Sequence, residues 1–80
     1  MVYVYILKSL KDNKYYIGIT KNLENRLVKH NRGEVFSTKA RKPFILIKSE
    51  EFENYLKARE REKEIKSYKG GNKFKKLIDV

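Results

Sequence analysis

Residues 2–20 read VYVYILKSLKDNKYYIGIT, and this stretch decides the fold. Two runs rich in β-branched and aromatic residues, 2–9 and 14–20, flank a segment in which Asp12 and Asn13 favour a turn. The stretch therefore predicts two antiparallel strands joined as a hairpin. Gly18 lies inside the second run, which is typical of a place where another group approaches the backbone closely.

Downstream of the hairpin, the sequence predicts a helix and then a third strand. Asn22 can cap a helix over residues 23–32, and Gly33 is well placed to end it in the left-handed conformation. Residues 34–42 lack periodicity and predict a basic loop, whereas residues 44–52 read as a strand.

The last third of the chain predicts two more helices. Residues 53–68 place Tyr55, Ala58, Ile65 and Tyr68 on one inward face. Two glycines break this helix, and Asn72 can cap a short final one. The order β-β-α-β-α-α predicts an α+β fold, with a small three-stranded antiparallel sheet flanked by helices.

The composition indicates a single basic domain. Twenty Lys and Arg against ten Asp and Glu give a formal net charge of +10, and 80 residues suffice for one domain spanning 1–80. Cysteine is absent, which excludes disulfides and thiolate metal sites and favours a cytoplasmic location. Apolar runs fall far short of the ~18 residues of a membrane span, so we expect no membrane partner.

Positive charge is concentrated in two stretches. Residues 21–42 carry seven cations and two acids, and residues 66–76 carry five cations and no acid. We expect both to contact nucleic-acid phosphates, although a merely soluble basic surface is the alternative. The candidate contacts are Lys39, Arg41, Lys42, Lys66, Lys69, Asn72 and Lys73. Further polar candidates for phosphate oxygens are Asn22, Asn31, Ser37 and Thr38.

Three other side chains are candidates for chemistry. Arg26 and His30 lie one turn apart on the predicted first helix, where Arg can neutralise a phosphate and His can move a proton near neutral pH. Glu62 falls in the apolar stripe of the long helix, where a carboxylate must be paired, protonated or metal-bound. The alternatives are a surface Arg beside a half-buried His, and a salt bridge between Glu62 and Lys66.

Two tripeptides give these residues a context. Tyr3-Val4-Tyr5 and Tyr16-Ile17-Gly18, with Tyr16 eleven residues after Tyr5, resemble the paired signature of the GIY-YIG nuclease superfamily, with Tyr3 in place of the first Gly. Residues 22–31 resemble the family's helix with its Arg and His, and Glu62 resembles its metal-binding Glu. Asn72 is the nearest candidate for the family's later Asn. The resemblance spans nearly the whole chain and is closest to a short, single-domain, largely uncharacterised bacterial branch.

The resemblance implies metal-dependent hydrolysis of phosphodiester bonds in DNA, either structure-specific or repair-related. Glu62 would hold a weakly bound Mg²⁺ or Mn²⁺, and Tyr5 or Tyr16 would take a proton from the attacking water, supported by Arg26 and His30. DNA is then the partner of a monomer or weak homodimer. Two other classes stay open: a non-catalytic basic nucleic-acid-binding module and a protein-interaction domain.

The nuclease hypothesis also predicts a geometry. Polar tips roughly 3 to 6 Å apart should line one concave patch open to solvent, with Gly18 leaving its floor open. Basic side chains should rim this patch, and a Glu62 turned to the far side of the sheet from Arg26 would overturn the catalytic assignment even if the fold is right. The side chains expected to line it are Tyr5, Tyr16, Arg26, His30 and Glu62.

Overall fold

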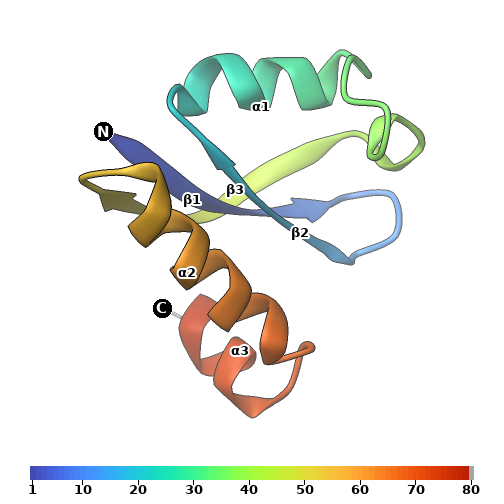
Figure 1. Ribbon diagram of the computed structural model, residues 1–80. Helices are drawn as coiled ribbons and strands as arrows, with labels where there is room; N and C mark the ends of the chain where they lie inside the picture. Colours follow the sequence, from blue (N-terminus) through green and yellow to red (C-terminus); the bar gives the residue numbers. More distant parts are fainter. Residues whose placement is uncertain (80) are drawn as a thin grey trace.

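The strands form one antiparallel sheet with the first strand at its centre. In the computed structural model, which describes residues 1–79, β1 (Val2–Ser9) lies between β2 (Tyr15–Thr20) and β3 (Phe44–Phe52) (Figure 1). The predicted hairpin is confirmed, and its register sets Tyr5 of β1 opposite Gly18 of β2. β2 is therefore an edge strand, with Gly18 near its middle.

Helices cover both faces of this sheet. The helix α1 (Leu23–Asn31) lies on one face, and α2 (Tyr55–Ser67) and α3 (Asn72–Ile78) lie on the other (Figure 1). A 3₁₀ turn, η1 (Lys39–Arg41), precedes β3. The predicted α+β class and the order β-β-α-β-α-α are confirmed. Within residues 1–79, the helices are too short and too polar to cross a bilayer.

Alternation along β1 divides the core into two layers. Val2, Val4 and Ile6 face α2 and α3, where the other buried members are Ala58, Ile65 and Phe74. Tyr5 and Leu7 point to the opposite face, where they pack with Phe44, Tyr16 and the α1 residues Leu23 and Leu27. Each fully buried aliphatic side chain contributes about 1.5–3 kcal/mol, so the apolar layers hold α1 and α2 against the sheet.

Two of the predictions made for the helices are confirmed and two are wrong. The Asn22 side chain caps α1 by accepting from the backbone N–H of Asn25 at 3.0 Å, and Gly33 has φ +75°, as predicted. The prediction that Asn72 caps the last helix is wrong, because Gly71 occupies the cap position and Asn72 is already helical. The inward position expected for Tyr55 is also wrong, since this side chain is exposed in the first turn of α2.

Candidate active site

A hydrogen-bonded chain of three buried side chains joins β1, α1 and the loop before η1. Tyr5 Oη lies 3.0 Å from His30 Nε2, and His30 Nδ1 lies 2.8 Å from Thr38 Oγ1. Tyr5 is 3% exposed, and His30 and Thr38 are 0% exposed. The Thr38 hydroxyl can donate to the Val35 carbonyl at 3.5 Å, and this carbonyl can only accept. Every proton finds an acceptor when Tyr5 donates to Nε2 and a neutral His30 donates from Nδ1 to Thr38.

The electrostatics of the chain favour these protonation states. Burial raises the pKa of Tyr5 well above its usual value, the neighbouring Tyr16 and the Glu62 carboxylate act in the same direction, and Arg26 opposes them. Burial lowers the pKa of His30 below its usual value, and the Arg26 guanidinium lowers it further. At neutral pH Tyr5 is thus a phenol, and His30 is a neutral imidazole ready to accept a proton.

Aromatic rings and a glycine fix this pair in place. Tyr16 and Phe44 pack edge-on against the His30 ring, with centroids 5.1 and 5.6 Å away. A Cβ on Gly18 would lie 2.5 Å from Tyr5 Oη, so the missing side chain makes room for the phenol. The expectation that Gly18 leaves the floor of an open patch bare is therefore wrong. The openness expected at Tyr5 and His30 is also wrong, because both side chains are buried between α1 and the sheet, whereas Tyr16 is half-buried.

Beside this pair, α1 presents a basic depression. Arg26 lies with Lys21 and Lys29 in a surface hollow of about 240 Å³ that is completed by the polar residues Thr20, Asn22 and Asn25. Among residues 1–79, no carboxylate lines this hollow. Three cations with hydroxyl and amide groups between them suit a phosphate group. Because the charge of Arg26 acts on both Tyr5 and His30, the hollow adjoins the buried chain.

Glu62 approaches the same tyrosine from the other face of the sheet. It lies on α2, its side chain is 17% exposed, and its carboxylate is 3.1 Å from Lys66 Nζ. The expectation that Glu62 shares one concave patch with Arg26 and His30 is wrong, because α2 and α1 pack on opposite faces of the sheet. The carboxylate nevertheless acts on the pKa of Tyr5, whose hydroxyl adjoins Gly18 on the edge strand. Arg26 and Glu62 thus both act on Tyr5, although they come from helices on opposite faces of the sheet.

Glu62 is the carboxylate in this region that could serve as a ligand for a metal ion. Within residues 1–79, three or more His, Asp or Glu side chains do not gather anywhere in a way that could hold one. One inward carboxylate is compatible with Mg²⁺ or Mn²⁺, which usually keep several waters and take one or two protein carboxylates together with substrate phosphates. A divalent ion at Glu62 would compete with the Lys66 ammonium.

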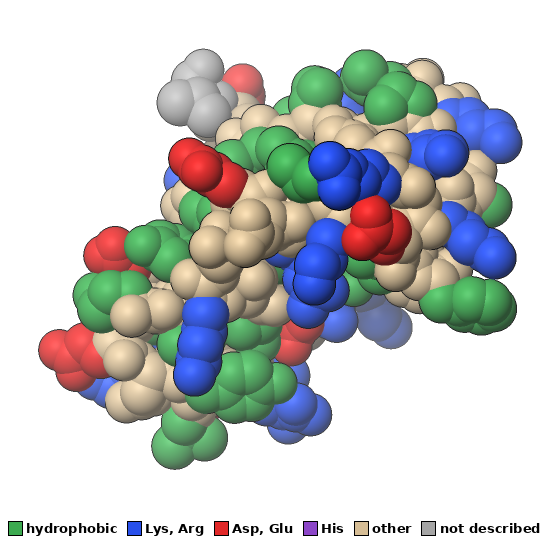
Figure 2. All heavy atoms as spheres, turned by 90° about the horizontal axis from the view of Figure 1, so that it is seen from above, with side chains coloured by type: hydrophobic (Ala, Val, Ile, Leu, Met, Phe, Trp, Pro, Cys, Tyr) green, Lys and Arg blue, Asp and Glu red, His purple; other side chains and the backbone are tan. Residues whose placement is uncertain are grey.

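The predicted nucleic-acid contacts occupy two separate regions. Lys39, Arg41 and Lys42 lie at η1 on the α1 side, and Lys66, Lys69, Asn72 and Lys73 lie along α2 and α3. In the view onto the α1 face, Lys and Arg gather at the end that carries the loop before β3, and acidic side chains lie mostly toward the other end (Figure 2). Some of these cations have internal partners: Arg41 binds Asp12 at 2.8 Å, and Lys39 and Lys73 lie over the rings of Phe36 and Tyr68.

Three polar residues proposed as phosphate contacts serve the fold. Asn22 is the cap of α1, and Thr38 is the buried partner of His30. The Asn31 side chain bonds both backbone groups of Phe44, accepting from its N–H at 2.6 Å and donating to its carbonyl at 3.1 Å. Sequence reasoning missed the role of Thr38, since no local pattern indicates that a loop hydroxyl folds back onto His30.

Comparisons with known proteins show the family of the chain. A protein-family model described as the GIY-YIG catalytic domain matches residues 1–75. A UPF0213 protein of Staphylococcus haemolyticus is 42% identical over 76 residues, which cover 94% of this chain and 92% of that protein. A UPF0213 protein of Natronomonas pharaonis is 38% identical over 78 residues, with coverage of 96% and 91%.

A solved structure gives the same result. The solution NMR structure of a UPF0213 protein from Bacillus halodurans matches with a TM-score of 0.60 and 34% identity, covering 98% of this chain and 83% of that one. The resemblance seen in the two tripeptides thus extends over the whole fold. The chain belongs to the GIY-YIG family of nuclease domains and to the UPF0213 group of proteins.

Proposed function

We propose that the protein is a divalent-metal-dependent endonuclease that hydrolyses phosphodiester bonds in DNA. The observation that carries this proposal is the hydrogen-bonded Tyr5–His30 pair, in which Arg26 acts on both residues and Glu62 acts on Tyr5. A phosphodiesterase needs a proton acceptor, a cation for the phosphate and a group that can hold a metal ion. The Tyr5–His30 pair, Arg26 and Glu62 are groups of these three kinds.

The buried pair provides a path for the proton of the attacking water. As water attacks phosphorus, its proton passes to Tyr5 Oη while the phenolic proton of Tyr5 passes to His30 Nε2, 3.0 Å away. The raised pKa of Tyr5 disfavours a free phenolate, so transfer to a neutral His30 is the easier route. Thr38 holds the imidazole in the tautomer with Nε2 free to accept. Tyr16, which is closer to solvent, would contact the water or the phosphate.

Arg26 would bind the scissile phosphate from the basic hollow on α1, supported by Lys21 and Lys29. A guanidinium held there meets negative charge that grows on the phosphate oxygens during the reaction. Glu62 would hold the divalent ion, which when bound supplies Lewis-acid stabilisation of the phosphate and the leaving oxygen. For this role the Glu62 carboxylate must part from Lys66, which then becomes free to contact DNA.

A second function has support in the same contacts. The Glu62–Lys66 ion pair and the burial of Tyr5 are compatible with a nucleic-acid-binding module that does not cleave. Such a module needs the basic hollow and the lysines of α2 and α3, but it does not need the acid at residue 62. The two functions therefore differ in whether Glu62 matters.

A substrate panel tests the proposal. Duplex, nicked, flap and single-stranded DNA and single-stranded RNA would be incubated with Mg²⁺ or Mn²⁺, with chelated metal as the control and Glu62→Ala as the matched inactive variant. The proposal predicts metal-dependent cleavage of at least one DNA that the variant does not cleave. A structure-specific or repair-related role predicts preference for flap or nicked DNA. Binding without cleavage under every condition would instead establish the binding module.

A further inference from the structure

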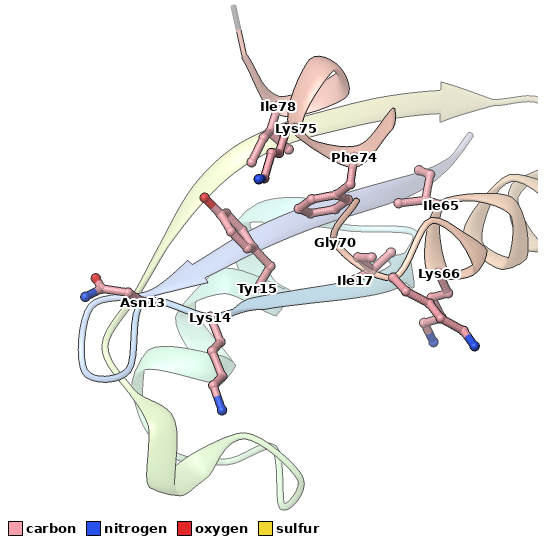
Figure 3. A pocket seen from close by; sticks show the side chains of 11 residues that line it. Asn13, Lys14, Tyr15, Ile17, Ile65, Lys66, Gly70, Phe74, Lys75 and Ile78 are labelled. Atoms are coloured by element: carbon pink, nitrogen blue, oxygen red, sulfur yellow. The ribbon is translucent and has the colours of Figure 1, made fainter. Parts of the chain in front are cut away.

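A cavity on the face of the sheet opposite α1 is not used by the proposed reaction. It has a volume of about 490 Å³ and lies between β2, the end of α2 and α3. Figure 3 shows the rings of Tyr15 and Phe74 at its centre, and these rings pack edge-on with centroids 5.1 Å apart. The apolar floor is formed by Tyr15, Ile17, Ile65, Phe74 and Ile78.

The rim of this cavity is strongly basic. Four lysines and an amide surround the apolar floor, and no carboxylate lines the cavity within residues 1–79. In Figure 3 the ammonium ends of Lys14 and Lys66 point away from the cavity, whereas that of Lys75 lies near the Tyr15 ring. An apolar aromatic floor with a cationic rim is complementary to a flat apolar group that carries negative charge at its edge. The rim lysines are Lys14, Lys66, Lys69 and Lys75.

A nucleotide has this combination of properties. Its base can pack on aromatic and aliphatic side chains, and its phosphates can reach lysine ammonium groups. The cavity volume lies within the roughly 300–1,000 Å³ typical of small-ligand sites, which is room for one nucleotide. A base inside a duplex is stacked on both sides and cannot enter, so the nucleotide must be unpaired.

Lys66 links the cavity to the proposed active site. It lines the cavity, and it also pairs with Glu62 at 3.1 Å. A strand whose nucleotide sits in the cavity therefore has a phosphate close to the proposed metal ligand. Building on the proposed nuclease function, we propose that this cavity binds one unpaired nucleotide of the DNA strand, with its base on the Tyr15 side of the floor and its phosphates on the lysine rim. The substrate class is then DNA with an unpaired segment.

Methyl NMR without divalent metal tests this inference directly. The chain would carry ¹³C-labelled isoleucine methyl groups and be titrated, in EDTA, with an abasic phosphodiester octamer that carries one central thymine. We expect the methyl signals of Ile17, Ile65 and Ile78 to shift, while that of Ile45, which is exposed on β3 and does not line the cavity, stays in place. The fully abasic octamer should bind roughly five- to 150-fold more weakly, the factor for losing one base stack. Equal affinity for the two octamers would overturn the inference, and so would the same three shifts with a blunt duplex.

A pair of charge reversals on α3 provides a matched control. Lys75→Glu changes the rim, whereas Lys76→Glu makes the same charge change one residue away, outside the cavity lining. We expect Lys75→Glu to weaken binding of the thymine octamer more than Lys76→Glu does, and equal losses would count against the cavity. These outcomes are independent of cleavage. Glu62-dependent cleavage without the methyl shifts would support the nuclease function and rule out nucleotide binding in the cavity. Methyl shifts without cleavage would support nucleotide binding in the cavity and count against the nuclease function.

Discussion

Gly18 and Tyr5 show how a single residue position determines the candidate site. The two residues are direct partners on the adjacent strands β1 and β2. The phenol of Tyr5 fills the space that a side chain at position 18 would need. This close approach brings Tyr5 Oη to His30 at a distance suited to proton transfer. The glycine of the second tripeptide is thus required by the tyrosine of the first.

Gly18→Ala should separate catalysis from folding. The new Cβ would lie 2.5 Å from Tyr5 Oη and 2.6 Å from its Cζ, so the ring must move and its bond to His30 must lengthen. Overpacking of this kind costs about 1–3 kcal/mol of unfolding free energy, and an ångström-scale displacement of a reacting group costs on the order of 100-fold in rate. Urea unfolding and nicking assays would measure both. Ser49→Ala, which alters the exposed partner of Tyr5 on β3, should leave nicking unchanged.

The buried imidazole predicts a pH dependence of stability. His30 titrates near 6.5 when unfolded, and burial and Arg26 lower its pKa in the folded protein. Between these two values the unfolded chain binds more protons, so the free energy of unfolding should fall as the pH falls below about 6.5, by at most about 1.4 kcal/mol per pH unit. Urea titrations of the parent and of His30→Gln would measure this slope. A parent and variant with the same slope between pH 6.5 and 5 would show that His30 keeps its ordinary pKa.

At the scale of elements, the sheet separates the two halves of the candidate site. The helix α1 supplies Arg26 and His30 on one face, and α2 supplies Glu62 on the other. In the free protein, the Lys66 ammonium forms an ion pair with the carboxylate of Glu62, which lies one helical turn before it. The pair therefore sets the availability of the proposed metal ligand.

Lys66→Gln should make Glu62 more available to a divalent ion. A partly exposed ion pair contributes about 0.2–1 kcal/mol, so removal of the lysine should tighten Mn²⁺ binding by up to about fivefold. Electron paramagnetic resonance of free Mn²⁺, measured without DNA, would give the dissociation constants. Lys63→Gln removes the same charge from the same helix and should have a smaller effect. Equal effects of the two variants would indicate that Lys66 does not compete for Glu62.

Much of the fold could be predicted because its signals are local. Alternation predicted β1 and β2, Asn22 and Gly33 marked the ends of α1, and the inward position of Glu62 followed from helical spacing. The distribution of helices over the two faces could not be predicted, because it depends on which side of the sheet each connection crosses. The bond between His30 and Thr38 was equally inaccessible, since it depends on how a loop of irregular backbone folds.

The whole molecule combines a net charge of +10 with basic regions on both faces. The hollow on α1 and the rim of the cavity beside α3 flank β2, so a strand that passes the edge would meet cations on either side. Binding should therefore depend steeply on salt. If about five phosphates are neutralised, the logarithm of the binding constant for duplex DNA should fall with the logarithm of salt concentration with a slope of roughly −4 to −5. Fluorescence anisotropy over a salt series would measure it, and a flat dependence would favour a protein partner.

The central claim, that Glu62 serves metal-dependent cleavage, is tested most directly by measuring nicking rate and DNA affinity together in Glu62→Gln. The change keeps the shape of the side chain and removes its charge, so metal-dependent nicking should be lost while DNA affinity stays equal or rises slightly. Glu60→Gln, an exposed position on the same helix, makes the same charge change and should nick like the parent. A Glu62→Gln protein that nicks at the parent rate would contradict the account.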